Sequence, residues 1–148
     1  MKSISSFLGD DHDRCDDLFA QAERSIDTKD WDQAGRDFAA FRTALEQHLA
    51  AEEEVLFPAF EQATGSSAGP TSVMRMEHAQ MRDILSQMAQ SLEQRDATDF
   101  LGGSETLNIM MQQHNLKEES ILYPMCDRAL GGRQETVLDT LESRLADD

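Results

Sequence analysis

The 148-residue sequence is strongly acidic and poor in aromatic residues. Its 29 Asp and Glu residues against 13 Lys and Arg give a net charge of −16, which would repel nucleic-acid phosphates and anionic lipid surfaces and so excludes nucleic acid and membranes as partners. Aromatic residues make up 6% of the chain and Pro occurs 3 times, so the composition favours a single all-α domain over residues 1–148.

The termini and the cysteines indicate a cytoplasmic protein. The first eight residues lack the apolar core of a secretory signal, and no stretch approaches the roughly 20 apolar residues that span a bilayer. Cys15 and Cys126 form no CxxC motif and are too few for a disulfide framework. We therefore interpret each as a small buried hydrophobic residue in a reducing compartment.

Four segments with helical apolar spacing follow one another, separated by breaks at 27–30, 64–71 and 96–98 and ended by the glycines at 131–132. Their predicted core positions are Leu8, Cys15, Phe19, Ala22 and Ile26; then Ala34, Phe38, Phe41, Leu45, Val55 and Ala59; then Met74, Met81, Leu85, Met88 and Leu92; and finally Phe100, Leu107, Met111, Ile121 and Met125. Apolar seams of this kind are typical of an up-down-up-down antiparallel four-helix bundle.

A shorter fifth helix is predicted at about 133–146. Its apolar face carries Val137, Leu138, Leu141 and Leu145. This face either caps the bundle or forms a homodimer, and the sequence leaves both open.

All four histidines fall into gaps of the four core series. The gaps hold His12, His48 with Glu52, His78, and His114 with Glu118. Four histidines would reach core positions together by chance on the order of one time in a hundred. The His and Glu of each pair are spaced four residues apart, about 6 Å along a helix, so both side chains reach the same small volume.

The same pattern occurs twice in the chain. An offset of 66 residues, the separation of His12 and His78, also superposes His48 on His114 and Glu52 on Glu118. We therefore predict two copies of one helical hairpin, at 1–66 and 67–132, which bring equivalent side chains to the same level of a shared core.

The chemistry of this residue set predicts a metal centre. Two buried carboxylates that face each other cost several kcal/mol unless a positive charge compensates them, and no core Lys or Arg is near. If Glu52 and Glu118 both bridge two ions, each ion receives two imidazole nitrogens and two carboxylate oxygens, leaving up to two positions for a bridging oxo or hydroxo group and an external ligand. Mixed imidazole and carboxylate donors suit iron best, with manganese or zinc as substitutes. The alternative is four ordinary, hydrogen-bonded core histidines.

These residues resemble the hemerythrin-like domains, which bind cations through a series of His, HxxxE, His and HxxxE. The resemblance rests on Asp11-His12, His48-xxx-Glu52-Glu53 with Leu56-Phe57-Pro58, Glu77-His78, and His114-xxx-Glu118-Glu119 with Leu122-Tyr123-Pro124. It covers roughly residues 8–129 and implies a non-haem diiron centre that interacts with dioxygen, nitric oxide or related small oxidants.

One departure from oxygen-carrying hemerythrins is Met74, which stands where those proteins have an extra histidine. We expect Met74 to overhang an open coordination position. The set of four histidines and two glutamates is instead similar to that of diiron proteins implicated in iron-sulfur cluster repair. Those proteins carry a further Cys-bearing N-terminal domain, for which this chain has no room.

Three neighbours of the six residues have simpler interpretations. Tyr123 matches Phe57 in the repeat, so we expect it to pack against its surroundings rather than bind metal. Glu53 and Glu119 follow the proposed ligands by one residue, and we expect them off the apolar seam, where they support a ligand or face solvent.

Three functions fit this centre. The preferred one is binding or sensing of a small diatomic ligand, dioxygen or nitric oxide. The second is a diiron enzyme or iron donor in nitrosative or oxidative stress defence and iron-sulfur cluster repair. The third is iron storage or trafficking, and the sequence leaves catalytic turnover open.

Overall fold

The computed structural model describes residues 2–146, and every regular element in this range is a helix. The elements are α1 (Ile4–Asp27), α2 (Trp31–Ala51), η1 (Glu52–Leu56), α3 (Phe57–Thr64), α4 (Pro70–Glu93), α5 (Ala97–Lys117), η2 (Glu118–Leu122), α6 (Tyr123–Leu130), η3 (Gly131–Arg133) and α7 (Gln134–Leu145). The predicted all-α class is confirmed. Within the described range, no helix is long and apolar enough to cross a membrane.

The two halves begin their returning helices with the same local signals. The side chains of Asp30 and Asp96 each accept a hydrogen bond from a backbone N–H in the first turn of the helix that follows, which caps α2 and α5. The preceding residues, Lys29 and Arg95, have positive φ values of 58° and 55° and reverse the chain. Both hairpins therefore turn in the same way.

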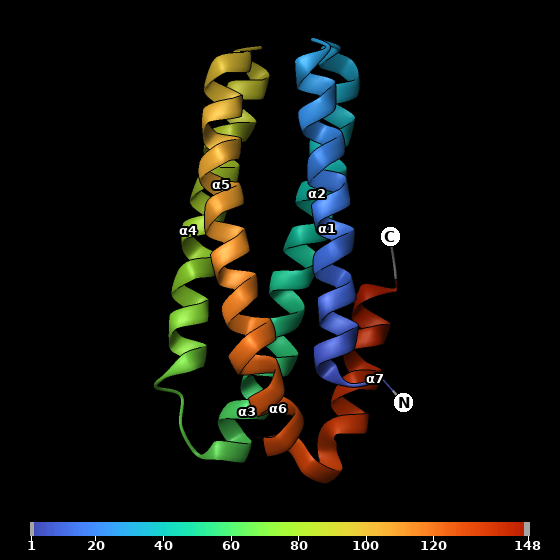
Figure 1. The fold of residues 1–148 in the computed structure, drawn as a ribbon, viewed down its shortest axis with the longest axis vertical. Helices are drawn as coiled ribbons and strands as arrows, with labels where there is room; N and C mark the ends of the chain where they lie inside the picture. The colour runs from blue at the N-terminus through green and yellow to red at the C-terminus, as the bar shows by residue number, and fades with distance from the viewer. Residues whose placement is uncertain (1, 147–148) are drawn as a thin grey trace.

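The long helices lie side by side as two hairpins (Figure 1). In each hairpin the first helix lies against the second, α1 against α2 and α4 against α5, and the hairpins meet through α1 with α5 and α2 with α4. Figure 1 shows α1 leaving the lower end of the bundle, α2 returning to it, α4 leaving it again and α5 returning. Each helix thus has neighbours on two sides and presents one face to a shared interior.

The buried apolar side chains form two clusters, one on each side of a polar layer. One gathers Ile4, Leu8, Ala51, Leu56, Phe57, Phe60, Met74, Leu122, Tyr123, Cys126, Leu130 and the apolar stripe of α7. The other gathers Phe19, Ala22, Ile26, Ala34, Phe38, Phe41, Leu45, Leu49, Met81, Leu85, Met88, Phe100, Leu107 and Met111. On α1, His12 lies between Leu8 of the first cluster and Phe19 of the second. The histidine layer is therefore enclosed by apolar packing above and below.

Two π-helical turns interrupt the second and fourth long helices. In η1 the backbone N–H of Phe57 donates to the carbonyl of Glu52, and in η2 that of Tyr123 donates to the carbonyl of Glu118. A π turn holds one residue more than an α turn, so the residues after it are displaced by one position around the helix.

Four predicted core positions within or after these turns are consequently wrong: Val55, Ala59, Ile121 and Met125. Ile121 is 55% exposed, and the other three are only partly buried. The buried positions are instead Leu56, Phe57, Phe60, Leu122, Tyr123, Cys126 and Leu130. One further predicted core residue, Leu92, is partly buried because α4 ends one residue after it.

α7 packs its apolar stripe against its own chain. Val137, Leu138, Leu141 and Leu145 are all buried within the first apolar cluster. The helix lies against α2 and η1 at the lower end of the bundle, next to the start of α1 (Figure 1). Of the two alternatives left open by the sequence, the structure has the fifth helix covering the bundle.

Both cysteines are buried, as the sequence predicts. Burial raises the pKa of the Cys15 thiol to about 11 and that of Cys126 to about 12. Because the thiolate is the reactive form, we expect neither to react with iodoacetamide at neutral pH until the protein unfolds. Mass spectrometry of samples treated with and without guanidinium chloride measures this. Modification of either cysteine in the folded protein at the rate of a free thiol would contradict the expectation.

Candidate metal centre

Six side chains from four helices converge at the level between the two apolar clusters. His12 comes from α1 and His78 from α4, while His48 and His114 lie in the last turns of α2 and α5. Glu52 and Glu118 are the first residues of η1 and η2, one turn beyond those histidines. All six are buried, and both glutamates are 0% exposed. The structure thus brings together every residue that the sequence places at the site.

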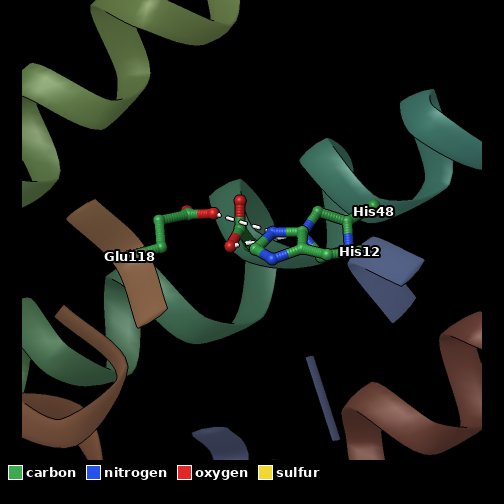
Figure 2. Close-up of side chains that lie close together, drawn as sticks. His12, His48 and Glu118 are labelled. Carbon is green, nitrogen blue, oxygen red and sulfur yellow. Dashed lines mark hydrogen bonds and ion pairs between the residues drawn. The ribbon is translucent and has the colours of Figure 1, made fainter. Parts of the chain in front are cut away.

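The six side chains form two overlapping groups. His12, His48, Glu52 and Glu118 make the first group, and Glu52, His78, His114 and Glu118 make the second. Within each group, one donor atom from each residue lies within 4.8 Å of all the others. Figure 2 shows three members of the first group, His12, His48 and Glu118, with the Glu118 carboxylate directed toward the imidazole of His12. Both glutamates are shared, so the arrangement is compatible with two neighbouring ions.

Several polar atoms of this layer make no hydrogen bond of good geometry. They are Oε1 of Glu52, Oε2 of Glu118 and Nε2 of both His78 and His114, although Nε2 of His78 lies 3.1 Å from Glu52 Oε1 and Nε2 of His114 lies 3.3 Å from Glu118 Oε1. A buried polar atom without a good hydrogen bond costs about 1–3 kcal/mol, so a group bound between these atoms would stabilise the layer. Carboxylate oxygens and the nitrogens of neutral imidazoles are metal donors, so the residues fit a bound cation.

Each histidine is held from behind by an acidic residue. In every case Nδ1 contacts a carboxylate oxygen at 2.6 to 2.8 Å, which leaves Nε2 facing the centre. The pairs are His12 with Glu119, His48 with Asp11, His78 with Glu53 and His114 with Glu77. Glu53 and Glu119 therefore lie off the seam and support His78 and His12. Asp11 and Glu77 support the other two histidines, although the sequence presented them only as neighbours of His12 and His78.

Three of these four acidic residues are in turn paired with a basic residue. Asp11 is paired with Arg14, Glu53 with Arg82, and Glu77 with Lys117. Among the described residues Glu119 has no Lys or Arg within 4.0 Å, and its side chain is 46% exposed. A solvent-open hollow of about 350 Å³ borders His12 and Glu119. A second hollow, of about 300 Å³, borders His114 and Glu77.

Charges within the layer balance one another when no metal is bound. Burial opposes a charged His48, but the adjacent Glu52 carboxylate outweighs it and raises the pKa of His48 well above its usual 6.5. Against the same effect of burial, Glu118 raises the pKa of His114 to about 9. Despite its burial, the neighbouring His48 holds the pKa of Glu52 well below 4.5. Protons on the imidazoles thus supply positive charge that cations would otherwise bring.

Tyr123 was predicted to pack only, and that prediction is incomplete. The side chain is fully buried, with its ring stacked on that of His12 at a centroid distance of 5.6 Å. Its hydroxyl also reaches the site, donating to Glu52 Oε2 at 2.5 Å and lying 3.0 Å from Glu118 Oε1. Burial, followed by the neighbouring carboxylates, raises the pKa of Tyr123 well above 10 in the metal-free chain. The sequence held one sign of this contact: the first repeat has Phe57 at the position where the second repeat has Tyr123, which carries a hydroxyl group.

Met74 is buried in the apolar cluster that adjoins the site, together with Phe57 and Tyr123. It lies one turn before His78 on α4, where the sequence analysis placed it. Its position over an open coordination place stays a prediction.

Comparison with known proteins agrees with this geometry. The model of the hemerythrin HHE cation-binding domain matches residues 3–126 of the chain. The chain belongs to the hemerythrin family. Its helical bundle and its layer of histidines and glutamates are therefore those of a hemerythrin-like domain.

Curated relatives of this hemerythrin-like domain include the iron-sulfur cluster repair proteins YtfE of Yersinia pestis (strain Pestoides F) and Yersinia pseudotuberculosis (serotype O:1b). Each is 31% identical over 106 residues, which cover 65% of this chain and 46% of the relative. The match thus spans about half the length of these relatives. No solved structure is significantly similar to the chain.

Proposed function

We propose that this hemerythrin-like domain holds two iron ions and acts in iron-sulfur cluster repair under oxidative or nitrosative stress. The ligands would be His12, His48, Glu52, His78, His114 and Glu118. The observation that carries the proposal is the pair of overlapping donor groups that share both glutamates. The buried nitrogen and oxygen atoms that make no good hydrogen bond support it, since a pair of cations would satisfy all of them at once.

The donor set favours iron over the other candidate metals. Each position offers two imidazoles and two carboxylates, whereas structural zinc is usually four-coordinate and often bound by cysteine. Neither Cys15 nor Cys126 belongs to the two donor groups. Manganese and zinc remain substitutes that the same donors would accept. The relatives are iron-sulfur cluster repair proteins, which supports iron as well.

Bound iron would supply one-electron redox chemistry and coordination places for a small ligand. The protein's own residues do the remaining work. The four Nδ1 contacts fix each imidazole with Nε2 toward the centre. The apolar clusters on both sides restrict water, which strengthens the attraction between the carboxylates and a cation. The hollows beside His12 and beside His114 leave two sides by which iron or a small ligand could enter.

Repair, rather than reversible binding alone, is proposed because the relatives that match are repair proteins. Their match includes only about half of their length, so the activity of the whole relatives comes to this chain as a proposal. Binding of dioxygen or nitric oxide is compatible with the same centre and would be one step of such a function.

The test begins with the full chain reconstituted with ferrous iron without oxygen and freed of unbound metal. Two irons per chain are expected by elemental analysis. The loaded protein is then added to an iron-sulfur enzyme whose cluster nitric oxide has damaged, and the regained activity and cluster absorbance are followed. Metal-free protein and the Glu52→Ala variant are the controls, and recovery should exceed both severalfold.

Other outcomes would select another function. Reversible uptake of nitric oxide or dioxygen at two irons per chain, with recovery no faster than in the controls, would reject repair in favour of binding or sensing. Iron that passes readily to a chelator without any change on exposure to either gas would support storage or trafficking. Absence of stoichiometric iron would reject all three.

A further inference from the structure

The phenol oxygen of Tyr123 contacts one polar atom of each of the four residues of the first group. It lies 2.5 Å from Glu52 Oε2, 3.0 Å from Glu118 Oε1, 3.2 Å from His12 Nε2 and 3.3 Å from His48 Nε2. The hydroxyl is therefore not at the edge of the site. It faces the group as a whole.

This placement matches one corner of a coordination octahedron. When donors lie about 2.1 Å from an octahedral ion, a donor at one corner lies about 3.0 Å from each of its four neighbours. The four distances from the phenol oxygen, 2.5 to 3.3 Å, lie on either side of that value. A fifth protein donor thus stands where an ion held by the first group would receive one.

The second group has no such donor. The residue equivalent to Tyr123 in the first repeat is Phe57, whose ring stacks on His78 at a centroid distance of 5.6 Å. The stacking of Tyr123 on His12 has the same centroid distance. The two rings thus occupy equivalent places, and the difference between them is a single hydroxyl group.

The π turn explains how Tyr123 reaches Glu118. Residues five apart on an α-helix, at about 100° per residue, point to largely opposite sides. In a π turn the i→i+5 hydrogen bond places residue i+5 above residue i, and η2 joins Glu118 to Tyr123 in this way. The same turn in η1 places Phe57 above Glu52. The distortion of the helix therefore creates the position that carries the hydroxyl.

We propose that Tyr123 is a further metal ligand at the first position, so that the two ions are inequivalent. The proposal rests on the proposed iron centre. On binding, the bond between the phenol oxygen and the ion forms, and the hydroxyl proton leaves to solvent with no change in oxidation state. The first position then has five protein donors and the second has four. An external ligand such as nitric oxide or dioxygen would bind at the second position, beside Phe57.

The experiment uses the single tyrosine of the chain as its own label. Phenolate bound to ferric iron gives a visible charge-transfer band, and laser excitation in that band enhances the vibrations of the phenolate ring. Iron-loaded protein is oxidised to the ferric state, and its iron content, absorption and resonance Raman spectra are recorded. The wild-type chain should contain two irons and show phenolate vibrations.

Three variants sharpen the test. Tyr123→Phe introduces the residue that the first repeat already has, so it should fold, keep iron and lose the band. Phe57→Tyr adds the equivalent hydroxyl at the second position and should increase the band about twofold, since the band reports the number of bound phenolates. The double exchange should move the band to the second position with its intensity restored. Circular dichroism checks that each variant is folded.

The outcomes separate this inference from the proposed function. Two irons in the wild-type chain without phenolate vibrations would overturn ligation by Tyr123 and leave the iron centre standing. A visible band that persists unchanged in Tyr123→Phe would also overturn it, because no other phenol exists in that variant. A chain that takes up no iron would refute both proposals together.

Discussion

Glu52→Ala should reduce the iron content from two ions per chain to one or none. Glu52 belongs to both donor groups and is fully buried, so its loss removes an oxygen donor from each position and leaves only the Glu118 carboxylate to balance the charge of two cations. Glu118→Ala should have the same effect, since Glu118 is the other shared residue. Elemental analysis after anaerobic reconstitution measures the change.

The two residues that follow Glu52 serve as matched controls. Glu53 supports His78 Nδ1 at 2.8 Å, so Glu53→Ala should keep two irons but weaken their binding by about 10–100-fold, as measured by competition with a chelator. Glu54 points outward to Arg144, and Glu54→Ala should leave both content and affinity unchanged. Two tightly bound irons in both Glu52→Ala and Glu118→Ala would reject the bridging role of these glutamates.

Phe41→Ala should lower the free energy of unfolding by about 3–5 kcal/mol without changing the iron stoichiometry. Phe41 is fully buried in the second apolar cluster, where its ring contacts Phe19 edge-on at 5.1 Å between centroids. Its removal leaves a cavity away from the two donor groups. Urea unfolding of the metal-free protein, followed by circular dichroism, measures the loss.

Ile121→Ala is the matched control for this prediction. Ile121 is 55% exposed, so the substitution should change the free energy of unfolding by less than about 0.5 kcal/mol. Equal destabilisation by the two substitutions would mean that the burial of these side chains is wrongly assigned. Loss of iron from folded Phe41→Ala would mean that the second cluster positions the ligands directly.

The sequence was sufficient to predict the helices and the convergence of the six side chains, because both depend on periodicity. Four histidines in the gaps of apolar seams can only face the interior if the segments are helical. The π turns were not predictable in this way, since nothing in the residues 52–56 distinguishes an α turn from a π turn. Because the π turns were not predicted, Val55 and Ile121 were wrongly assigned to the core.

The contacts behind the histidines depend on side-chain conformation, which the sequence specifies only weakly. Asp11, for example, precedes His12 in the sequence, but its carboxylate contacts His48 on the neighbouring helix. The role of Tyr123 was missed for a related reason. Because the equivalent residue of the first repeat is Phe57, packing was the simplest explanation. Tyr123 does stack on His12, but its hydroxyl also donates to Glu52.

Shared glutamates have a consequence for assembly. In the proposed centre, each ion would be bound by two histidines and a glutamate of one hairpin and by a glutamate of the other hairpin. Neither hairpin alone could therefore supply the full set of donors. Two metal ions would therefore act as non-covalent cross-links across the interface between the halves, in addition to the apolar clusters. Cut within the 65–69 linker, the two fragments should remain together more firmly with iron than without it. A single hairpin of this sequence pattern, paired with a second copy of itself, would present the same six donors. The present chain therefore resembles a homodimer of hairpins whose two copies are joined in one polypeptide.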